Sequence, residues 1–392
     1  MKHRIIKKFK EISGKILFII LVNLIIIAAA DRLVGWLFKA PVQGQTIHQK
    51  KFIRLRQFQP NLDMTQLPSD YYISNTDGLV RKEVKFRTDE YGFLKPSRKH
   101  ENPDLNIFFI GGSTTECQYV EEAKRFPVVV GNLIEEKTGL KVNAYNGGRS
   151  GSNSLHSIDI LLNRILPLKP HTVLMMHNVN DVIILLYTGS YWNNHFNRSP
   201  IEEENFVLDS QPTVFSLSKR MFRFITPHLH FQTKKLSERI RARSNPDPSM
   251  ADEWAGVRRG KLKYSKPWML SEFKKMLRTF VAICKIHNVT PVLMTQQNRY
   301  TEYPDALIQR IMKQMKDDFG IEYHEFRTLY NDFNESIRLI AKDENILLID
   351  LDVKIPKNKE FIYDTFHFNN KGSLLAAKII SAELIKSVIQ KK

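Results

Sequence analysis

Five short apolar runs recur between residues 105 and 351, in the pattern that is typical of buried β-strands. The first of them, LNIFFI, is continuously apolar, as expected for a strand that is covered on both faces of a sheet. The runs are 105–110 (LNIFFI), 142–145 (VNAY), 172–176 (TVLMM), 291–295 (PVLMT) and 345–351 (NILLIDL).

Segments with helical periodicity separate these runs. They cover residues 126–137, 155–166, 266–287, 305–317, 323–343 and 370–390. Strands that alternate with helices predict a parallel sheet of about five strands with helices on both faces, which is a three-layer α/β/α fold with right-handed crossovers. We expect this domain to occupy residues 104–392.

Two regions interrupt the alternation. Residues 41–103 mix polar, aromatic and basic residues, and 83–93 alternates like a hairpin, so we expect a linker with a small β-rich extension. Residues 187–262 are too long for an ordinary connection and indicate a lid, an insertion or a long loop. Within them, 214–243 would suit a basic helix on a membrane or a helix packed on the domain.

The N-terminus has the pattern of a membrane anchor or a signal peptide. Six lysines and arginines within residues 1–15 precede an apolar run from Ile16 to Ala30. Such a charge distribution predicts a basic cytoplasmic tail, with the bulk of the chain on the other side of the membrane. The run is short against the roughly 20 residues that span a bilayer, so an uncleaved transmembrane anchor would extend over 16–38. Residues 28–30 (AAA) also fit a cleavage site.

Both alternatives place the domain outside the cytoplasm. An anchor would give a single-pass membrane protein, and cleavage would give a secreted or periplasmic one. The net charge of +18 favours anionic partners such as nucleic acid, anionic lipid or acidic glycan. No helix-turn-helix, zinc-finger or RNA-binding motif occurs, so we expect no nucleic-acid partner. The two cysteines, Cys117 and Cys284, are expected to be buried free thiols. The oligomeric state is not indicated.

Two sequence blocks at opposite ends of the predicted domain carry candidate catalytic groups. Residues 111–115 (GGSTT) follow the first strand, where a sharp strand-to-helix turn would expose Ser113 as a nucleophile and aim its N–H at an oxyanion. The alternative is a simple loop that caps a helix. Asp364 and His367 form the only Asp-x-x-His in the chain, which suits a base held by an acid, or an ion pair at the surface.

Two further blocks follow the second and third strands. Residues 146–151 (NGGRSG) would expose backbone N–H groups to a ligand, or form a tight turn. Asn180, in 178–181 (NVND), could donate its side-chain amide to an oxyanion, or belong to an Asx turn. In an open α/β sheet, ligands bind at the carboxyl ends of the strands. Together the four blocks therefore predict one active site.

These four blocks resemble those of the SGNH/GDSL hydrolases, in the segments FFIGGSTTE, YNGGRSG, HNVND and DTFH. The resemblance covers about 104–186 and 288–390. It implies a flavodoxin-like fold, a Ser113–His367–Asp364 triad, and oxyanion donors from Ser113, Gly151 and Asn180. The usual Gly-Asp-Ser is Gly-Gly-Ser here, a variant found among envelope- and polysaccharide-associated relatives.

The resemblance implies cleavage of an O-acyl ester through an acyl-serine intermediate, with no metal and no cofactor. An O-acetyl group on an envelope glycan or lipid is the expected substrate. Two alternatives stay open: an O-acyltransferase to a glycan hydroxyl, and a non-catalytic, membrane-tethered binding protein with the same fold. Arg149 and Gln296 are candidate substrate-binding residues, because arginine recognises anions and Gln296 follows the fourth strand.

Overall fold

The computed structural model describes residues 14–19, 21–23, 25–26, 48–195, 197–206 and 265–389. The chain divides into two compact units, one of residues 1–51 with 203–231 and one of 52–202 with 232–392. In the first unit, residues 14–19, 21–23 and 25–26 are helical. Within the described ranges no helix is both long enough and apolar enough to cross a bilayer. Most of the predicted anchor, 16–38, lies outside those ranges.

The second unit contains a five-stranded parallel sheet, as predicted. Its strands stand in the order β5-β4-β6-β8-β9. Their bounds are β4 Leu105–Gly111, β5 Val142–Asn146, β6 Thr172–Met176, β8 Thr290–Met294 and β9 Leu347–Ile349. β9 is shorter than the predicted 345–351, because Asp350 accepts a hydrogen bond from the backbone of Val353 and so caps the short helix α12 (Leu351–Lys354).

The carboxyl ends of the strands are level with one another. Gly111 of β4 is in register with Met176 of β6, which is in register with Met294 of β8. From β4 the chain first runs to β5 on one side and then returns to β6 on the other side. The connections that follow β4 and β5 therefore run in opposite directions across the sheet. The carboxyl ends of β4 and β6 form the topological switch point, where ligands bind in such sheets.

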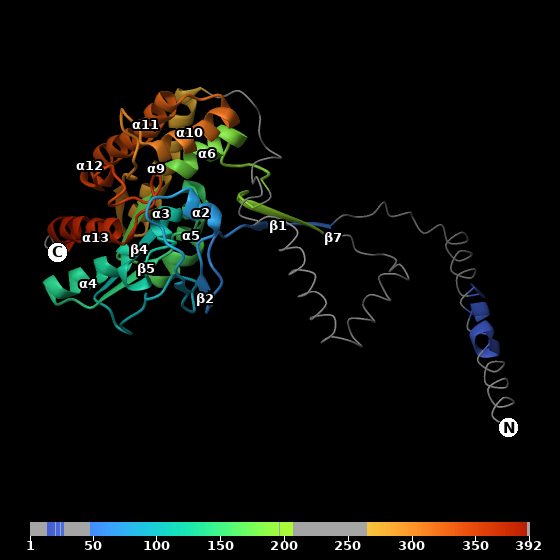
Figure 1. The fold of residues 1–392 in the computed structure, drawn as a ribbon. Coiled ribbons are helices and arrows are strands. Elements are labelled where there is room, and N and C mark those ends of the chain that lie inside the picture. Colours follow the sequence, from blue (N-terminus) through green and yellow to red (C-terminus); the bar gives the residue numbers. More distant parts are fainter. Residues whose placement is uncertain are drawn as a thin grey trace. The chain divides into compact units, whose positions relative to one another are not determined.

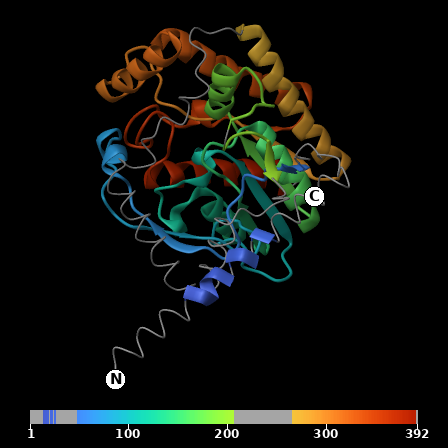
Figure 2. The ribbon, with the colours of Figure 1, turned by 90° about the vertical axis from the view of Figure 1, so that its right-hand side faces the viewer.

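Helices cover both faces of the sheet (Figure 1, Figure 2). One face carries α4 (Phe126–Thr138) and α13 (Asn370–Leu384), which pack against each other. The other face carries α5 (Ser154–Ile160), α6 (Val179–Thr188), α9 (Lys266–Ile286) and α11 (Tyr323–Asp343), with α10 (Ala306–Phe319) beside α11.

Alternate residues of each strand supply the two cores. On β4, Phe108 and Ile110 belong to the core under α9 and α11, whereas Ile107 and Phe109 belong to the core under α4 and α13. Burial of each such side chain stabilises the fold by about 1.5–3 kcal/mol.

The two cysteines are free and buried, as expected.

The extension before the sheet differs from the predicted hairpin. β3 (Val84–Arg87) pairs with β2 (Asp63–Gln66) in antiparallel fashion, and the pairing expected within 83–93 is reduced to one bridge, Thr88–Leu94. The Asp89 side chain accepts hydrogen bonds from the backbone N–H groups of Tyr91 and Phe93, which closes the turn early. Leu94 then bridges to the end of β5. The short helix α2 (Asp70–Ser74) lies between β2 and β3.

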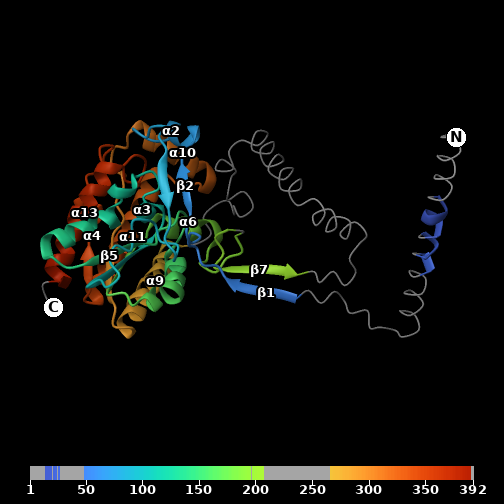
Figure 3. The ribbon, with the colours of Figure 1, turned by 90° about the horizontal axis from the view of Figure 1, so that it is seen from below.

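The predicted insertion, 187–262, is described only at 187–195 and 197–206. β7 (Ile201–Phe206) pairs with β1 (His48–Ile53) in a two-stranded sheet (Figure 3). The candidate helix 214–243 lies outside the described residues.

Candidate active site

Ser113 stands on a sharp turn from strand to helix. β4 ends at Gly111, and Ser113 begins the short helix α3 (Ser113–Glu116). A β-carbon at Gly111 would lie only 2.6 Å from the carbonyl oxygen of Met176, and one at Gly112 would overlap the amide of Asn180. The two glycines are therefore required by close approach of the neighbouring loops, and they bring the serine to the switch point.

A hydrogen-bond relay runs from Ser113 to Asp364. Ser113 Oγ lies 2.6 Å from His367 Nε2, and His367 Nδ1 lies 2.6 Å from Asp364 Oδ2. The other carboxylate oxygen, Oδ1, accepts the backbone N–H groups of Phe366 and His367. The loop before α13 thus holds the acid and the imidazole in a fixed relation, although 254 positions separate His367 from the serine.

The environment keeps Asp364 ionised. Burial by itself would raise the pKa of Asp364, but the charge of His367 and the hydrogen bonds from His367 and Phe366 hold it below its ordinary value. The ring of Tyr363 stacks on the imidazole of His367 at 5.6 Å. The side chains of His367 and Asp364 are 16% and 13% exposed. The relay is therefore shielded from bulk water while a path to it stays open.

The loops after β5 and β6 meet beside Ser113. We call residues 147–152 the glycine loop. Asn180, in the first turn of α6, donates its side-chain amide to the carbonyl oxygen of Ser152 over 2.8 Å. That oxygen would lie 3.3 Å from a β-carbon at Gly112. An amide nitrogen carries two hydrogens, so Asn180 has a second donor beyond this bond. Gly151 has a φ of 75°, which favours glycine.

Glu116 connects the short helix α3, which begins at Ser113, to the glycine loop. Its side chain is 2% exposed, and its Oε2 accepts the backbone N–H of Ser150 at 2.5 Å and the Ser150 hydroxyl at 2.7 Å. Burial raises the pKa of Glu116, against the effect of the two bonds from Ser150. The sequence motifs did not single out Glu116, although it lies three positions after Ser113 and directly follows the block 111–115.

Gln296 lies near Ser113, but its side chain is buried and bonds to protein groups, which differs from the substrate contact expected from the sequence. It is 2% exposed, and its Nε2 donates to the hydroxyl of Thr114 at 2.9 Å. Its Oε1 accepts the backbone N–H of Val179 at 3.0 Å and the hydroxyl of Tyr330 at 2.8 Å. These bonds point into the protein, so Gln296 supports the turn that carries Ser113 from behind.

Arg149 contacts the extension. Its guanidinium donates to the carbonyl oxygen of Gln57 and lies 5.1 Å from the ring centre of Phe58. These contacts anchor the glycine loop to the segment that precedes β2. In the part of the chain that the structure describes, no three His, Cys, Asp or Glu side chains are grouped to hold a metal ion.

A second Ser–His–Asp set lies nearby, but it is buried. Ser157 Oγ lies 2.6 Å from His177 Nε2, and His177 Nδ1 lies 3.6 Å from Asp181. All three residues are at most 2% exposed, so no substrate reaches them. Burial lowers the pKa of His177 to about 3, which makes it a poor base. This set supports the helices behind the glycine loop.

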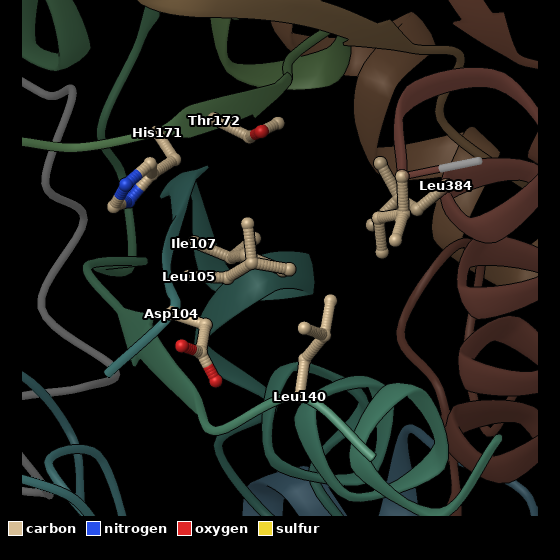
Figure 4. A pocket seen from close by; sticks show the side chains of 8 residues that line it. Asp104, Leu105, Ile107, Leu140, His171, Thr172 and Leu384 are labelled. Carbon is tan, nitrogen blue, oxygen red and sulfur yellow. The ribbon is translucent and has the colours of Figure 1, made fainter. Parts of the chain in front are cut away.

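A cavity of about 310 Å³ lies at the opposite edge of the sheet, near the first residues of β4 and β6 (Figure 4). Its lining is Asp104, Leu105, Ile107, Leu140, His171, Thr172, Leu384 and Ile389. Ser113 follows the other end of β4, so this cavity is separate from the relay.

No family model matches this chain, and no curated protein matches it either. Several solved structures resemble it. Axe2, an acetylxylan esterase from Geobacillus stearothermophilus, is 16% identical, and the match covers 72% of this chain and 95% of that chain with a TM-score of 0.40. A lipase/acylhydrolase from Enterococcus faecalis is 16% identical over 71% and 95%, with a TM-score of 0.39. LAE5, an alpha/beta hydrolase enzyme from the metagenome of Lake Arreo, Spain, is 14% identical over 72% and 95%, with a TM-score of 0.40.

Proposed function

We propose that this chain is a serine esterase of the SGNH/GDSL type that cleaves an O-acyl ester. One observation carries the proposal: Ser113 Oγ, His367 and Asp364 form a continuous relay with two contacts of 2.6 Å. Nucleophile, base and orienting acid in this arrangement are what nucleophilic attack on an acyl carbon requires. The glycine loop and Asn180 lie beside the serine, where the oxyanion of the tetrahedral intermediate would form.

The proposed reaction proceeds in two halves. His367 Nε2 takes the proton of Ser113 as Oγ attacks the ester carbonyl carbon, and the ionised Asp364 stabilises the imidazolium. The N–H groups of Ser113 and Gly151 and the amide of Asn180 bind the oxyanion. His367 then gives the proton to the departing alkoxide, and an acyl-serine remains. A water that is deprotonated by His367 attacks this intermediate, which releases the acid and frees Ser113.

We further propose that the substrate is an O-acyl group, most simply O-acetyl, on an envelope glycan or lipid. The support is the sequence of the N-terminus, where basic residues precede the apolar run 16–30 and the expected anchor segment 16–38. We propose that this run anchors the protein in a membrane, with the domain outside the cytoplasm. N-terminal sequencing of the mature protein tests the anchor, because cleavage after residues 28–30 would remove it.

The hydrolase proposal is tested with an aryl acetate and a fluorophosphonate probe. Ser113→Ala should abolish both acetate release and labelling. Ser157→Ala is the matched control, because Ser157 also lies beside a histidine but is buried. We expect this control to keep labelling at Ser113, with thermal unfolding used to check that it folds. Equal hydrolysis by wild type and Ser113→Ala would refute the proposal.

A further inference from the structure

The loop that carries the acid and the base of the relay is held by residues outside it. We call this loop, residues 363–367, the triad loop. The carbonyl oxygen of Thr365 accepts the backbone N–H of Arg299, in the segment after β8, at 2.8 Å. The carbonyl oxygen of Tyr363 accepts the backbone N–H of Asp77, in the extension, at 2.6 Å. The position of the triad loop therefore depends on two segments that lie far before it in the sequence.

These two outside residues also form an ion pair with each other. Asp77 Oδ2 lies 2.8 Å from Arg299 Nη1, and the side chains are 34% and 2% exposed, respectively. Arg299 also pairs with Asp305, which caps α10, and donates from Nη1 to the carbonyl oxygen of Ile362 at 3.3 Å. Ile362 directly precedes the triad loop. The guanidinium therefore connects the extension, the start of α10 and the triad loop.

The charge of Arg299 is buried, so it needs compensation. Two carboxylates supply it, those of Asp77 and Asp305. The Nε of Arg299 is buried and makes no hydrogen bond to the described residues. Without the carboxylate of Asp77, the guanidinium would be paired with Asp305 alone. We expect it to shift towards Asp305 in that case, and so away from Ile362.

The extension also contacts the chain just after α3, on the side of the nucleophile. The ring of Tyr72 packs edge-on against that of Tyr119, with 5.5 Å between the ring centres. Lys82 Nζ lies 3.1 Å from the carboxylate of Glu121. Asp77 lies between these two contacts in the sequence. The segment that carries Asp77 is therefore attached to the nucleophile side of the relay as well as to the triad loop.

We propose that Asp77 is a positioning residue for the catalytic base. Its N–H and its ion pair with Arg299 hold the triad loop, and so keep His367 at hydrogen-bond distance from Ser113. This inference rests on the proposed esterase function, because it gives the extension a part in the same relay. A displacement of about 1 Å in a reacting group lowers a rate by as much as about 10²-fold, so a small shift of the triad loop is enough to matter.

The first test changes the side chain of Asp77 and leaves its N–H in place. Asp77→Ala in the full-length protein should lower kcat on an aryl acetate by about 10- to 100-fold, with KM unchanged. Asp77→Glu keeps the charge and should recover most of the loss. If Asp77→Ala unfolds below the assay temperature, Asp77→Asn takes its place, because it keeps the size of the side chain and loses the charge.

Asp70→Ala is the matched control. Asp70 is another aspartate of the extension, but its side chain is 86% exposed and it pairs with Arg81, which also belongs to the extension. This variant should keep the wild-type kcat. Thermal unfolding of every variant shows that each assay is run on folded protein.

The second test separates positioning of the base from support of the fold. In His367→Ala no base remains to be positioned, and the residual hydrolysis depends on the oxyanion donors and on binding. Asp77→Ala should therefore cause no further loss of kcat in that background, since both changes act on the same group. In the single variant Asp77→Ala, fluorophosphonate labelling of Ser113 should slow by about the same factor as kcat.

Two outcomes would overturn the inference. One is a wild-type kcat in folded Asp77→Ala. The other is an equal loss with and without His367, which would mean that Asp77 supports the fold or the oxyanion donors. In both cases hydrolysis by the wild type would still depend on Ser113, so the esterase proposal would stand. That proposal fails differently, when wild type and Ser113→Ala hydrolyse the aryl acetate equally, and the inference on Asp77 then falls with it.

Discussion

The side-chain amide of Asn180 occupies the space that a β-carbon at position 112 would need. The glycine before the nucleophile is therefore part of the geometry that holds Asn180 beside Ser113. This relation gives a physical reason for the Gly-Gly-Ser sequence, since a larger residue at 112 would push the amide away.

Gly112→Ala should accordingly act through Asn180. We expect kcat on an aryl acetate to fall by roughly 10²–10³, the usual effect of losing one oxyanion donor. Asn180→Ala should cause a similar loss, and the double variant should lose little more than either single one, because both changes remove the same donor. Fully additive losses would show that position 112 acts in another way.

Asp364→Asn should lower kcat by about 10⁴ with little change in KM, because an amide favours the wrong imidazole tautomer.

The same variant tests the pKa of Asp364. That pKa is lowered in the folded protein, so the carboxylate stabilises the fold above the unfolded value of about 3.9, and this contribution is lost as the pH falls through the lower folded value. Urea unfolding at several acidic pH values should show a shallower pH dependence for Asp364→Asn. An unchanged slope would contradict the assigned direction.

Glu116→Gln separates loop positioning from stability. The bonds from Ser150 to a charged carboxylate are stronger than those to an amide, so we expect kcat to fall about tenfold. The pKa of Glu116 is raised, so the charged form costs stability as the pH rises above the unfolded value of about 4.3. The variant should therefore melt at the same or a higher temperature at neutral pH. A large drop in melting temperature, with kcat intact, would refute this role.

Gln296→Leu tests whether Gln296 contacts the substrate or supports the turn. Loss of the amide leaves the N–H of Val179 without its acceptor, at a cost of about 1–3 kcal/mol in the free energy of unfolding, whereas the Tyr330 hydroxyl keeps the carbonyl oxygen of Gln297 at 3.0 Å as an acceptor. We expect lower stability and lower kcat, with KM unchanged for several esters. A rise in KM that depends on the ester would instead support the earlier assignment of Gln296 to substrate binding.

The sheet could be predicted from sequence because its signals are local. The run LNIFFI has the continuous apolar character of a buried strand. The blocks at Ser113 and Asn180 each follow a strand, and the block at His367 precedes a helix. Parallel strands bring their carboxyl ends to one edge, so these blocks were expected to meet there. The hairpin expected at 83–93 is reduced to a turn with one antiparallel bridge, because β3 pairs with a strand about twenty residues earlier, which alternation alone does not reveal.

The roles of the arginines could not be predicted, because they depend on contacts between distant segments. Arg149 lies next to the glycines in sequence, yet its guanidinium donates to the carbonyl oxygen of Gln57 and packs on the ring of Phe58. Arg198 is 47 positions from Gly151 and lies against it. Neither periodicity nor motif spacing distinguishes these two arginines, and only the fold does.

The separation of 254 positions between Ser113 and His367 has a consequence for synthesis. A ribosome makes Ser113 long before His367, and α13, which follows the loop that holds His367, packs on α4. A nascent chain, or one that ends before residue 364, therefore contains the serine without a partner to take its proton. The proposed reactivity therefore arises only after the segment with Asp364 and His367 has been synthesised and has folded against the sheet.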